Sequence, residues 1–248
     1  MRKHKIDYFF SLKRFIHTIN ALLYREIITR TSTLNLGIFG VFLSPLIQLL
    51  SFVIFFSFIR NSYENILIFL TLGITIFSLF SDISFRSSNA IDANTQLIRT
   101  YRPIKIIDII ITRTLIESFL NFLILTVLLI LIYIYKREIT IENFNLGISV
   151  FFLAIIFSLG VGLVTLIIST LFSFTKNFLP FITRPIYFLS GVFFSLNDIP
   201  EYLKPFLSWN PLIHFIELSR NAFMSNYKLD DRISLNYAFY SAFTALII

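Results

Sequence analysis

The stretch from Ile106 to Tyr135 is a long run of Ile, Leu, Phe and Val in which Asp108, Arg113 and Glu117 are the only charged residues. About 20 such residues suffice to cross the hydrocarbon core of a bilayer as a helix. Lipid offers no hydrogen bonds to the backbone, and a helix satisfies its backbone groups within one segment. The sequence therefore predicts an all-α membrane protein.

The composition of the whole chain agrees with this prediction. Of 248 residues, 56% are hydrophobic and only 14% are charged, against about 25% charged in a typical soluble domain. The chain contains no cysteine, which excludes disulfides, thiol nucleophiles and cysteine-ligated zinc. The net charge of +7 is attributed to cytoplasmic loops rather than to nucleic-acid binding.

Six spanning helices are predicted from the apolar runs. They are Leu34 to Ile59, Asn65 to Leu79, Ile106 to Tyr135, Leu146 to Phe174, Phe178 to Leu196, and a last one that begins at Leu235. The last segment has room for only about 21 Å of helix, against a hydrocarbon core of about 30 Å. We therefore expect the sixth span, and a basic tail after it, to continue beyond Ile248.

Residues 1–33 are expected to form a cytoplasmic amphipathic interface helix ahead of the transmembrane domain at 34–248. Apolar residues recur at helical spacing from Phe9 to Ile27, with basic residues between them, which suits an anionic membrane surface. Lys and Arg concentrate in this segment and in the polar loop 82–105, whereas acidic and basic residues balance on the other side. The positive-inside rule therefore places the N-terminus in the cytoplasm.

The segment 197–236 is predicted outside the cytoplasm. Its apolar pieces are separated by Pro200, Pro205 and Pro211 and are too short to cross a bilayer. Re-entrant or interfacial helices are expected there, since backbone at membrane depth must be covered by protein or border a water-filled cavity.

Few residues are candidates for metal binding, catalysis or a buried ion pair. His214, Glu217 and Arg220 share one helical face, but a metal site would need a further ligand, so no metal and no catalytic residue is predicted. Arg113 and Glu117, four residues apart in the third span, are expected to form a buried ion pair, with a proton relay as the alternative.

None of the seven glycines begins a phosphate-binding loop. Any ATP and Mg²⁺ would therefore be bound by another chain, and this chain is expected to hold no cofactor.

Several stretches, in order and spacing, resemble the permeases of capsule-polysaccharide ABC exporters, the KpsM-like branch of the ABC-2 family. The matches are ALLYREIITR (21–30), NAIDANTQLIRTYRPIKIIDIIITRTLIE (89–117), GVGL (160–163), RPIYFLSGVFFSLNDIP (184–200) and WNPLIHFIELSR (209–220). Two positions depart from the family pattern. Ser44 stands where an acidic residue often precedes the proline, and Ile106 stands where a second proline is common.

The resemblance implies a homodimeric, multi-pass permease of the bacterial inner membrane. Its implied partners are two ATP-binding-cassette ATPase subunits, membrane lipid and periplasmic or outer-membrane export proteins, with no nucleic acid. The residues implied to contact the ATPase are Arg25, Glu26, Arg30, Asn94, Arg99, Tyr101 and Arg102. Attraction to anionic lipid headgroups is the alternative role for their charges.

The expected function is export of a lipid-linked capsular polysaccharide by a transporter subunit that is not itself an enzyme. Candidates for the substrate path are Arg184, Tyr187, Phe193 and Phe194, because aromatic rings can stack on sugars and Arg184 could hold an anion or extend to the interface. Trp209, His214, Glu217 and Arg220 are expected in a periplasmic gate or docking helix. The alternatives are a permease for another glycan such as O-antigen or teichoic acid, a membrane-embedded enzyme of lipid or sugar using His214 and Glu217, and an ion-coupled carrier.

Overall fold

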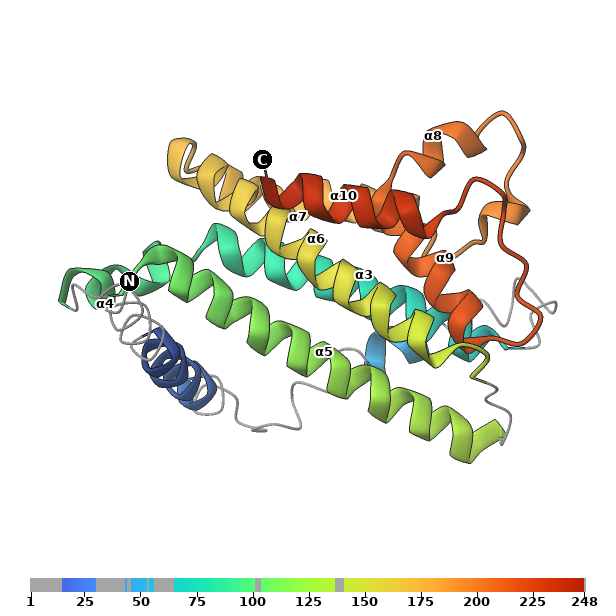
Figure 1. Cartoon of the computed structure of the whole chain (residues 1–248), viewed down its shortest axis with the longest axis horizontal. Coiled ribbons are helices and arrows are strands. Elements are labelled where there is room, and N and C mark those ends of the chain that lie inside the picture. Colours follow the sequence, from blue (N-terminus) through green and yellow to red (C-terminus); the bar gives the residue numbers. More distant parts are fainter. Residues whose placement is uncertain are drawn as a thin grey trace, which may run out of the picture.

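The computed structural model describes residues 15–29, 43, 46–52, 54–55, 65–100, 104–136 and 141–247. Every regular element within these ranges is a helix, as the composition predicts. Three long helices lie side by side along the length of the molecule (Figure 1). They are α3 (Ile66–Ser88), α5 (Ile106–Lys136) and α6 (Phe144–Leu171).

These three helices are the described segments that are long and apolar enough to cross a membrane. Their mean hydropathies are 2.2, 2.5 and 2.8, and they coincide with the second, third and fourth predicted spans. The first predicted span lies mostly outside the described residues, although 46–52 and 54–55 are helical. The six-span count therefore stays a prediction.

The predicted fifth and sixth spans correspond to shorter helices, α7 (Thr175–Leu189) and α10 (Leu235–Ile247). The 15 residues of α7 make about 22 Å of helix, less than a hydrocarbon core of about 30 Å. The helix stops seven residues before the predicted end at Leu196, because Gly191 adopts a φ of +75° that turns the chain away.

Helix α3, the second predicted span, continues past its predicted end and into the polar segment 82–105. Three serines in this extension, Ser84, Ser87 and Ser88, are buried instead of facing solvent. Thr165 donates from its hydroxyl to the carbonyl of Ser84 at 3.2 Å, and Ser169 donates to that of Ser88 at 2.9 Å. Small polar residues of this kind let two membrane helices approach closely, so α3 remains helical as far as Ser88.

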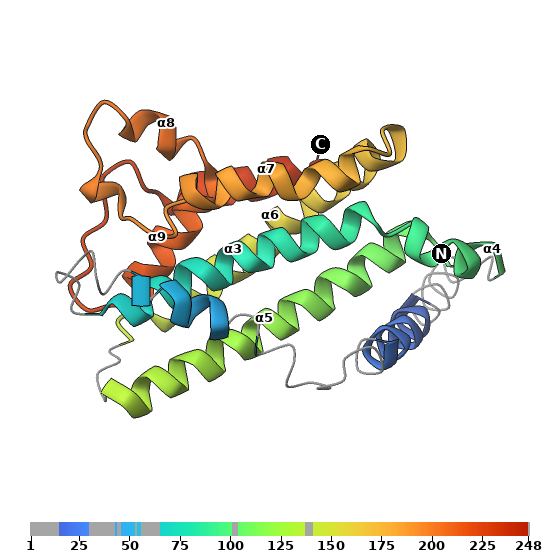
Figure 2. The same ribbon diagram turned by 180° about the vertical axis from the view of Figure 1, so that it is seen from behind.

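The short helices gather at the two ends of the bundle (Figures 1 and 2). One end carries the helix at 15–29, η1 (Asp92–Asn94) and α4 (Thr95–Thr100). The opposite end carries η2 (Leu196–Asp198), α8 (Lys204–Ser208) and α9 (Pro211–Phe223).

The main core surrounds α3, which packs against α5, α6 and α9. A second, smaller core joins Leu22 of the N-terminal helix to Ala90, Ile109 and Leu166. The predicted amphipathic helix is thus present at 15–29 with part of its apolar face against protein, and its position at a membrane surface stays a prediction.

Candidate functional site

A polar groove lies between α3 and α7. It has a volume of about 280 Å³. Its lining residues are Gln48, Phe77, Ser78, Ser81, Asp82, Thr183, Arg184, Tyr187 and Phe188. Charged and hydroxylated side chains are costly among membrane helices and tend to mark substrate or ion pathways, so this groove is the strongest candidate for contact with a hydrophilic cargo.

Two predicted substrate-path residues, Arg184 and Tyr187, share one face of α7 and line this groove together. The Tyr187 hydroxyl accepts a hydrogen bond from the amide of Gln48 at 2.9 Å. Its ring lies 4.7 Å from the ring of Phe77 and 5.0 Å from that of Phe193, centroid to centroid. Tyr187 is therefore held in place, while the exposed Arg184 is available to a ligand.

The other two predicted substrate-path residues, Phe193 and Phe194, do not line the groove and make different contacts. Phe193 supports the ring of Tyr187, whereas the carbonyl of Phe194 accepts a hydrogen bond from Arg220 at 3.1 Å.

The groove also contains two polar residues that the sequence did not single out, Gln48 and Asp82. A polar stripe on the second span could have revealed Ser78, Ser81 and Asp82, which share one face of α3.

At the end of the bundle that carries α9, Arg220 and Glu217 form a buried ion pair at 3.1 Å with neither side chain exposed. The guanidinium of Arg220 also donates to the carbonyl of Val192 at 2.8 Å and lies 3.3 Å from the centroid of the Phe69 ring. Tyr227 donates from its hydroxyl to Glu217 at 2.9 Å. Both charges are therefore paired and hydrogen-bonded, which burial of charge requires.

The three ionisable residues predicted for a gate or docking helix are thus buried in α9. The apolar residues of the helix are buried as well, so α9 is enclosed on more than one side and its ionic residues face other protein elements. A gate or docking surface at this end would have to be built from exposed residues such as Trp209, whose side chain is 82% exposed.

His214 is also buried, but its contacts are separate from those of the Glu217–Arg220 ion pair. Its Nε2 donates to the carbonyl of Ser208 at 2.8 Å, and its Nδ1 accepts from the amide of Ser234 at 3.2 Å. The imidazole stacks on Tyr237 with 4.4 Å between ring centroids. These two bonds fix one neutral tautomer and join the end of α8 to the start of α10. Within the described ranges, no three His, Cys, Asp or Glu side chains gather as a metal site would require.

The stability of this end should depend on pH through His214. Burial lowers the pKa of His214, against a smaller effect of the Ser208 hydrogen bond that raises it. Because the unfolded chain then binds the proton more readily, stability is present above the unfolded pKa of about 6.5 and falls as the pH drops below it. Each unit of pKa difference is worth about 1.4 kcal/mol.

Thermal unfolding of the purified protein between about pH 7.5 and 5.5 tests this expectation. The His214→Gln variant should lose the part of the pH slope that His214 contributes. The His17→Gln variant, at an exposed position of the N-terminal helix, should keep it. Equal slopes in the wild type and in His214→Gln would contradict the prediction.

At the opposite end, two predicted ATPase-contact elements touch each other. Arg25 of the N-terminal helix donates to the amide oxygen of Asn94 in η1, although the two residues lie far apart in sequence. Lys176 at the start of α7 forms an ion pair with Asp92. A polar cavity of about 600 Å³ opens beside them, lined by Arg25, Thr29 and the residues from Asp92 to Leu97.

The remaining predicted contact residues are placed only in part. Glu26 is half-buried on the N-terminal helix. Arg99 belongs to α4, but its side chain is outside the described set, and Arg30, Tyr101 and Arg102 lie outside the described residues altogether.

The family comparison supplies the decisive observation. The model of the ABC-2 type transporter family matches residues 17–224, which include most of the described helices. The chain belongs to the ABC-2 type transporter family.

Three relatives of this ABC-2 chain carry descriptive names. It is 36% identical over 223 residues to the polysialic acid transport protein KpsM of Escherichia coli, covering 89% of this chain and 86% of the relative. It is 32% identical to the capsule polysaccharide export inner-membrane protein BexB of Haemophilus influenzae, covering 84% and 79%. It is 29% identical to the protein of the same description, CtrC, of Neisseria meningitidis serogroup A, covering 90% and 85%.

The two residues of the predicted third-span ion pair, Arg113 and Glu117, both contact α3 in this ABC-2 transporter chain. Glu117 and Arg113 are both buried on α5. Glu117 pairs with Arg86 at the end of α3, and Arg113 donates to the backbone carbonyl of the same arginine. The sequence did not predict that Arg86 is the partner of Glu117, because the two residues are far apart in the chain and become neighbours only when α3 packs against α5. These contacts tie the two helices near η1.

Proposed function

We propose that the chain is the permease subunit of an ATP-driven exporter that moves a lipid-linked capsular polysaccharide across the bacterial inner membrane. Two copies would form the channel and two ATP-binding-cassette subunits would drive it, with the N-terminus of each permease in the cytoplasm. The observation that carries the proposal is the similarity, along most of the chain, to permeases named for polysialic acid transport and capsule polysaccharide export.

The polar groove between α3 and α7 supports a hydrophilic cargo. Arg184 offers a cation to a carboxylate or phosphate, and the Tyr187 ring offers an apolar face to a sugar. Ser78, Ser81 and Thr183 add hydroxyl groups that can exchange hydrogen bonds with those of a glycan. An arrangement that mixes charge, hydroxyls and aromatic rings fits a charged polysaccharide better than it fits an inorganic ion.

The end that carries η1 and the N-terminal helix is the proposed ATPase-contact surface. The hydrogen bond between Arg25 and Asn94 joins its two parts into one polar surface. The ion pair between Lys176 and Asp92 connects that surface to α7, which carries Arg184. Movement imposed there by an ATPase would therefore reach the groove.

The experiment is deletion of the gene followed by complementation. Deletion should remove polysaccharide from the cell surface while leaving it inside the cell, and the wild-type chain should restore export only together with its ATPase. Intact surface capsule after deletion, or loss of another surface glycan instead, would overturn the proposed cargo.

The same assay tests the groove. Arg184→Gln should reduce export by roughly tenfold, because a hydrogen bond to a charged group is worth about 1.5 kcal/mol or more and about 1.4 kcal/mol corresponds to tenfold. Ile182→Ala is the matched control, since Ile182 lies on α7, is exposed and does not line the groove. Equal export by Arg184→Gln and the wild type at equal protein levels would exclude the groove from the path.

A further inference from the structure

A second groove, on another side of the bundle, is almost purely apolar. It has a volume of about 470 Å³ and lies between α5 and the start of α6. Its lining residues are Phe122, Leu125, Thr126, Leu129, Ile130, Tyr133, Ile141, Phe144 and Phe223. We call it the α5–α6 groove. We propose that it binds one acyl chain of a membrane phospholipid, in the leaflet on the side of α9.

The groove follows one face of α5. Phe122, Thr126, Ile130 and Tyr133 recur at helical spacing along it. From Phe122 to Tyr133 the helix rises about 16 Å at 1.5 Å per residue, which is about half of a hydrocarbon core of about 30 Å. The groove therefore has the length of the hydrocarbon region of one leaflet, which is the length that a single acyl chain occupies.

The floor and walls of the groove are built from apolar groups. Phe223, at the end of α9, is buried behind it, and it fits there because Gly147 has no side chain, since a Cβ at that position would lie 2.6 Å from its ring. Thr126 turns its hydroxyl onto the carbonyl of Phe122 at 2.8 Å, so its hydrogen-bonding capacity is already used. Water in this groove would find few partners and would be costly to hold.

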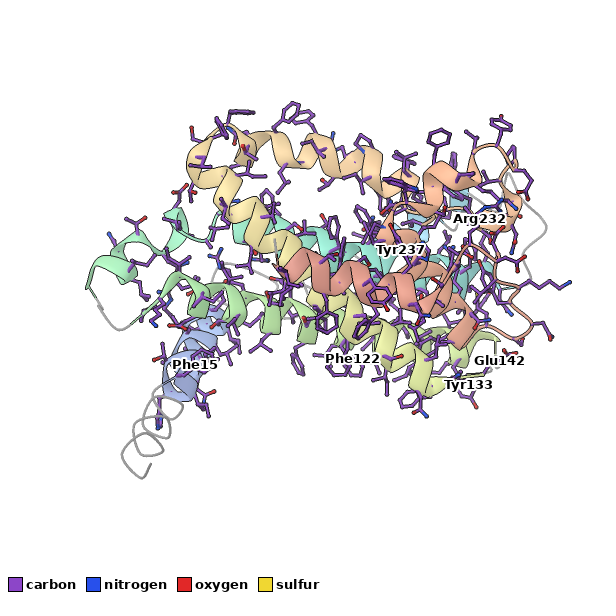
Figure 3. All side chains as sticks on the ribbon, turned by 45° about the horizontal axis from the view of Figure 1, so that its top comes forward. Phe15, Phe122, Tyr133, Glu142, Arg232 and Tyr237 are labelled. Carbon is purple, nitrogen blue, oxygen red and sulfur yellow. The ribbon has the colours of Figure 1, made fainter. Side chains whose placement is uncertain are left out.

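One end of the groove has the character of a membrane interface. Figure 3 shows Phe122 and Tyr133 along α5, with Glu142 near the Tyr133 end. Tyrosine is enriched where the hydrocarbon core meets the lipid headgroups, because its ring is apolar and its hydroxyl is polar. Glu142 itself accepts a hydrogen bond from the amide of Asn226 at 2.9 Å. A headgroup would therefore lie beside Tyr133 and the chain would run toward Phe122.

A bilayer lipid fits this position better than a protein partner does. In both views α5 lies on the opposite side of the bundle from α7 (Figures 1 and 2), so the groove is remote from the polar groove that holds Arg184. The helices that form it have mean hydropathies of 2.5 and 2.8. A surface this apolar on membrane-spanning helices faces hydrocarbon. The inference requires that α5 and α6 cross the membrane and does not depend on the proposed cargo.

The test uses the permease together with its ATPase, in lipid nanodiscs that contain a phosphatidylethanolamine with a photoactivatable group on one acyl chain. After irradiation, mass spectrometry should find the label on α5–α6 groove residues severalfold more often than on other exposed residues of α5. Thr126→Phe and Ile130→Trp, which fill the groove, should each reduce that labelling severalfold. Leu131→Trp should not, because Leu131 is exposed at the same depth without lining the groove.

Three results would overturn the proposal. The first is equal labelling of the groove and of the Leu131 face, unchanged by the filling variants. The second is groove labelling that is absent when the proteins come from cells that make the polysaccharide and present when they come from cells that do not, which would assign the groove to a lipid anchor of the cargo. The third is a disulfide between two copies that carry Ile130→Cys, a clean probe because the chain has no other cysteine, which would assign it to a second permease copy.

Discussion

Replacing Arg220 by methionine is expected to destabilise the protein by roughly 3–5 kcal/mol, the typical cost of removing one partner from a buried ion pair. The substitution leaves Glu217 buried with no opposite charge, and it removes the donors to the carbonyls of Val192 and Phe194. The apolar methionine would fill much of the space over the Phe69 ring but could not replace these bonds. Thermal unfolding of the purified permease in nanodiscs measures the effect.

The matched control is Arg232→Met. Arg232 also forms ion pairs, with Glu201 at 3.0 Å and with Asp230 at 3.3 Å, but its side chain is 39% exposed, and exposed pairs contribute little to stability. Its loss leaves the buried Asp230 paired with Lys204. The double variant Arg220→Met with Glu217→Gln should recover part of the loss, because it removes the unpaired buried charge. Equal melting temperatures for Arg220→Met and Arg232→Met would contradict the prediction.

Replacing Gly160 by alanine is expected to push α10 away from α6. A Cβ at this position would lie 2.4 Å from the carbonyl carbon and oxygen of Ala245 and 2.7 Å from the amide of Leu246. Because these are backbone atoms, no side-chain rotation can relieve the clash, and overpacking of this kind costs about 1–3 kcal/mol. Thermal unfolding, together with polysaccharide export in cells, measures the result.

Gly162→Ala is the control on the same helix. There the nearest atom is the side-chain oxygen of Ser87 at 2.7 Å, which can rotate away. Alanine also gains up to about 1 kcal/mol over glycine inside a helix. We therefore expect Gly162→Ala to be close to neutral, and a Gly160→Ala variant as stable and as active as Gly162→Ala would show that α6 and α10 are not in close contact.

The apolar helices were the part of the fold that the sequence predicted best. The run from Ile106 to Tyr135 is helical over its whole length, because a long apolar run in lipid can satisfy its backbone hydrogen bonds within one segment only as a helix. The end of α3 was harder to predict. Ser84 and Ser88 look like loop residues in sequence, yet they are buried through bonds with Thr165 and Ser169, which only packing brings close.

The candidate site was predicted only in part, because packing brings together residues that are distant in the sequence. Arg184 and Tyr187 could be named because an arginine and a tyrosine on one face of an apolar helix are conspicuous. The inward orientation of Glu217 and Arg220 could not, because helical spacing says which residues share a face and not what that face meets. Gln48 was missed because its partner, Tyr187, is distant in the chain.

The ion pair between Lys176 and Asp92 has a mechanical consequence. Lys176 and Arg184 belong to the same helix and are separated by about 12 Å of rise at 1.5 Å per residue. Between them stands Pro180, which has no amide hydrogen to donate and so weakens the helix at that point. A displacement of η1 would pull the first turn of α7 and concentrate bending at Pro180. Arg184 would then swing relative to α3, without any rearrangement of the long helices.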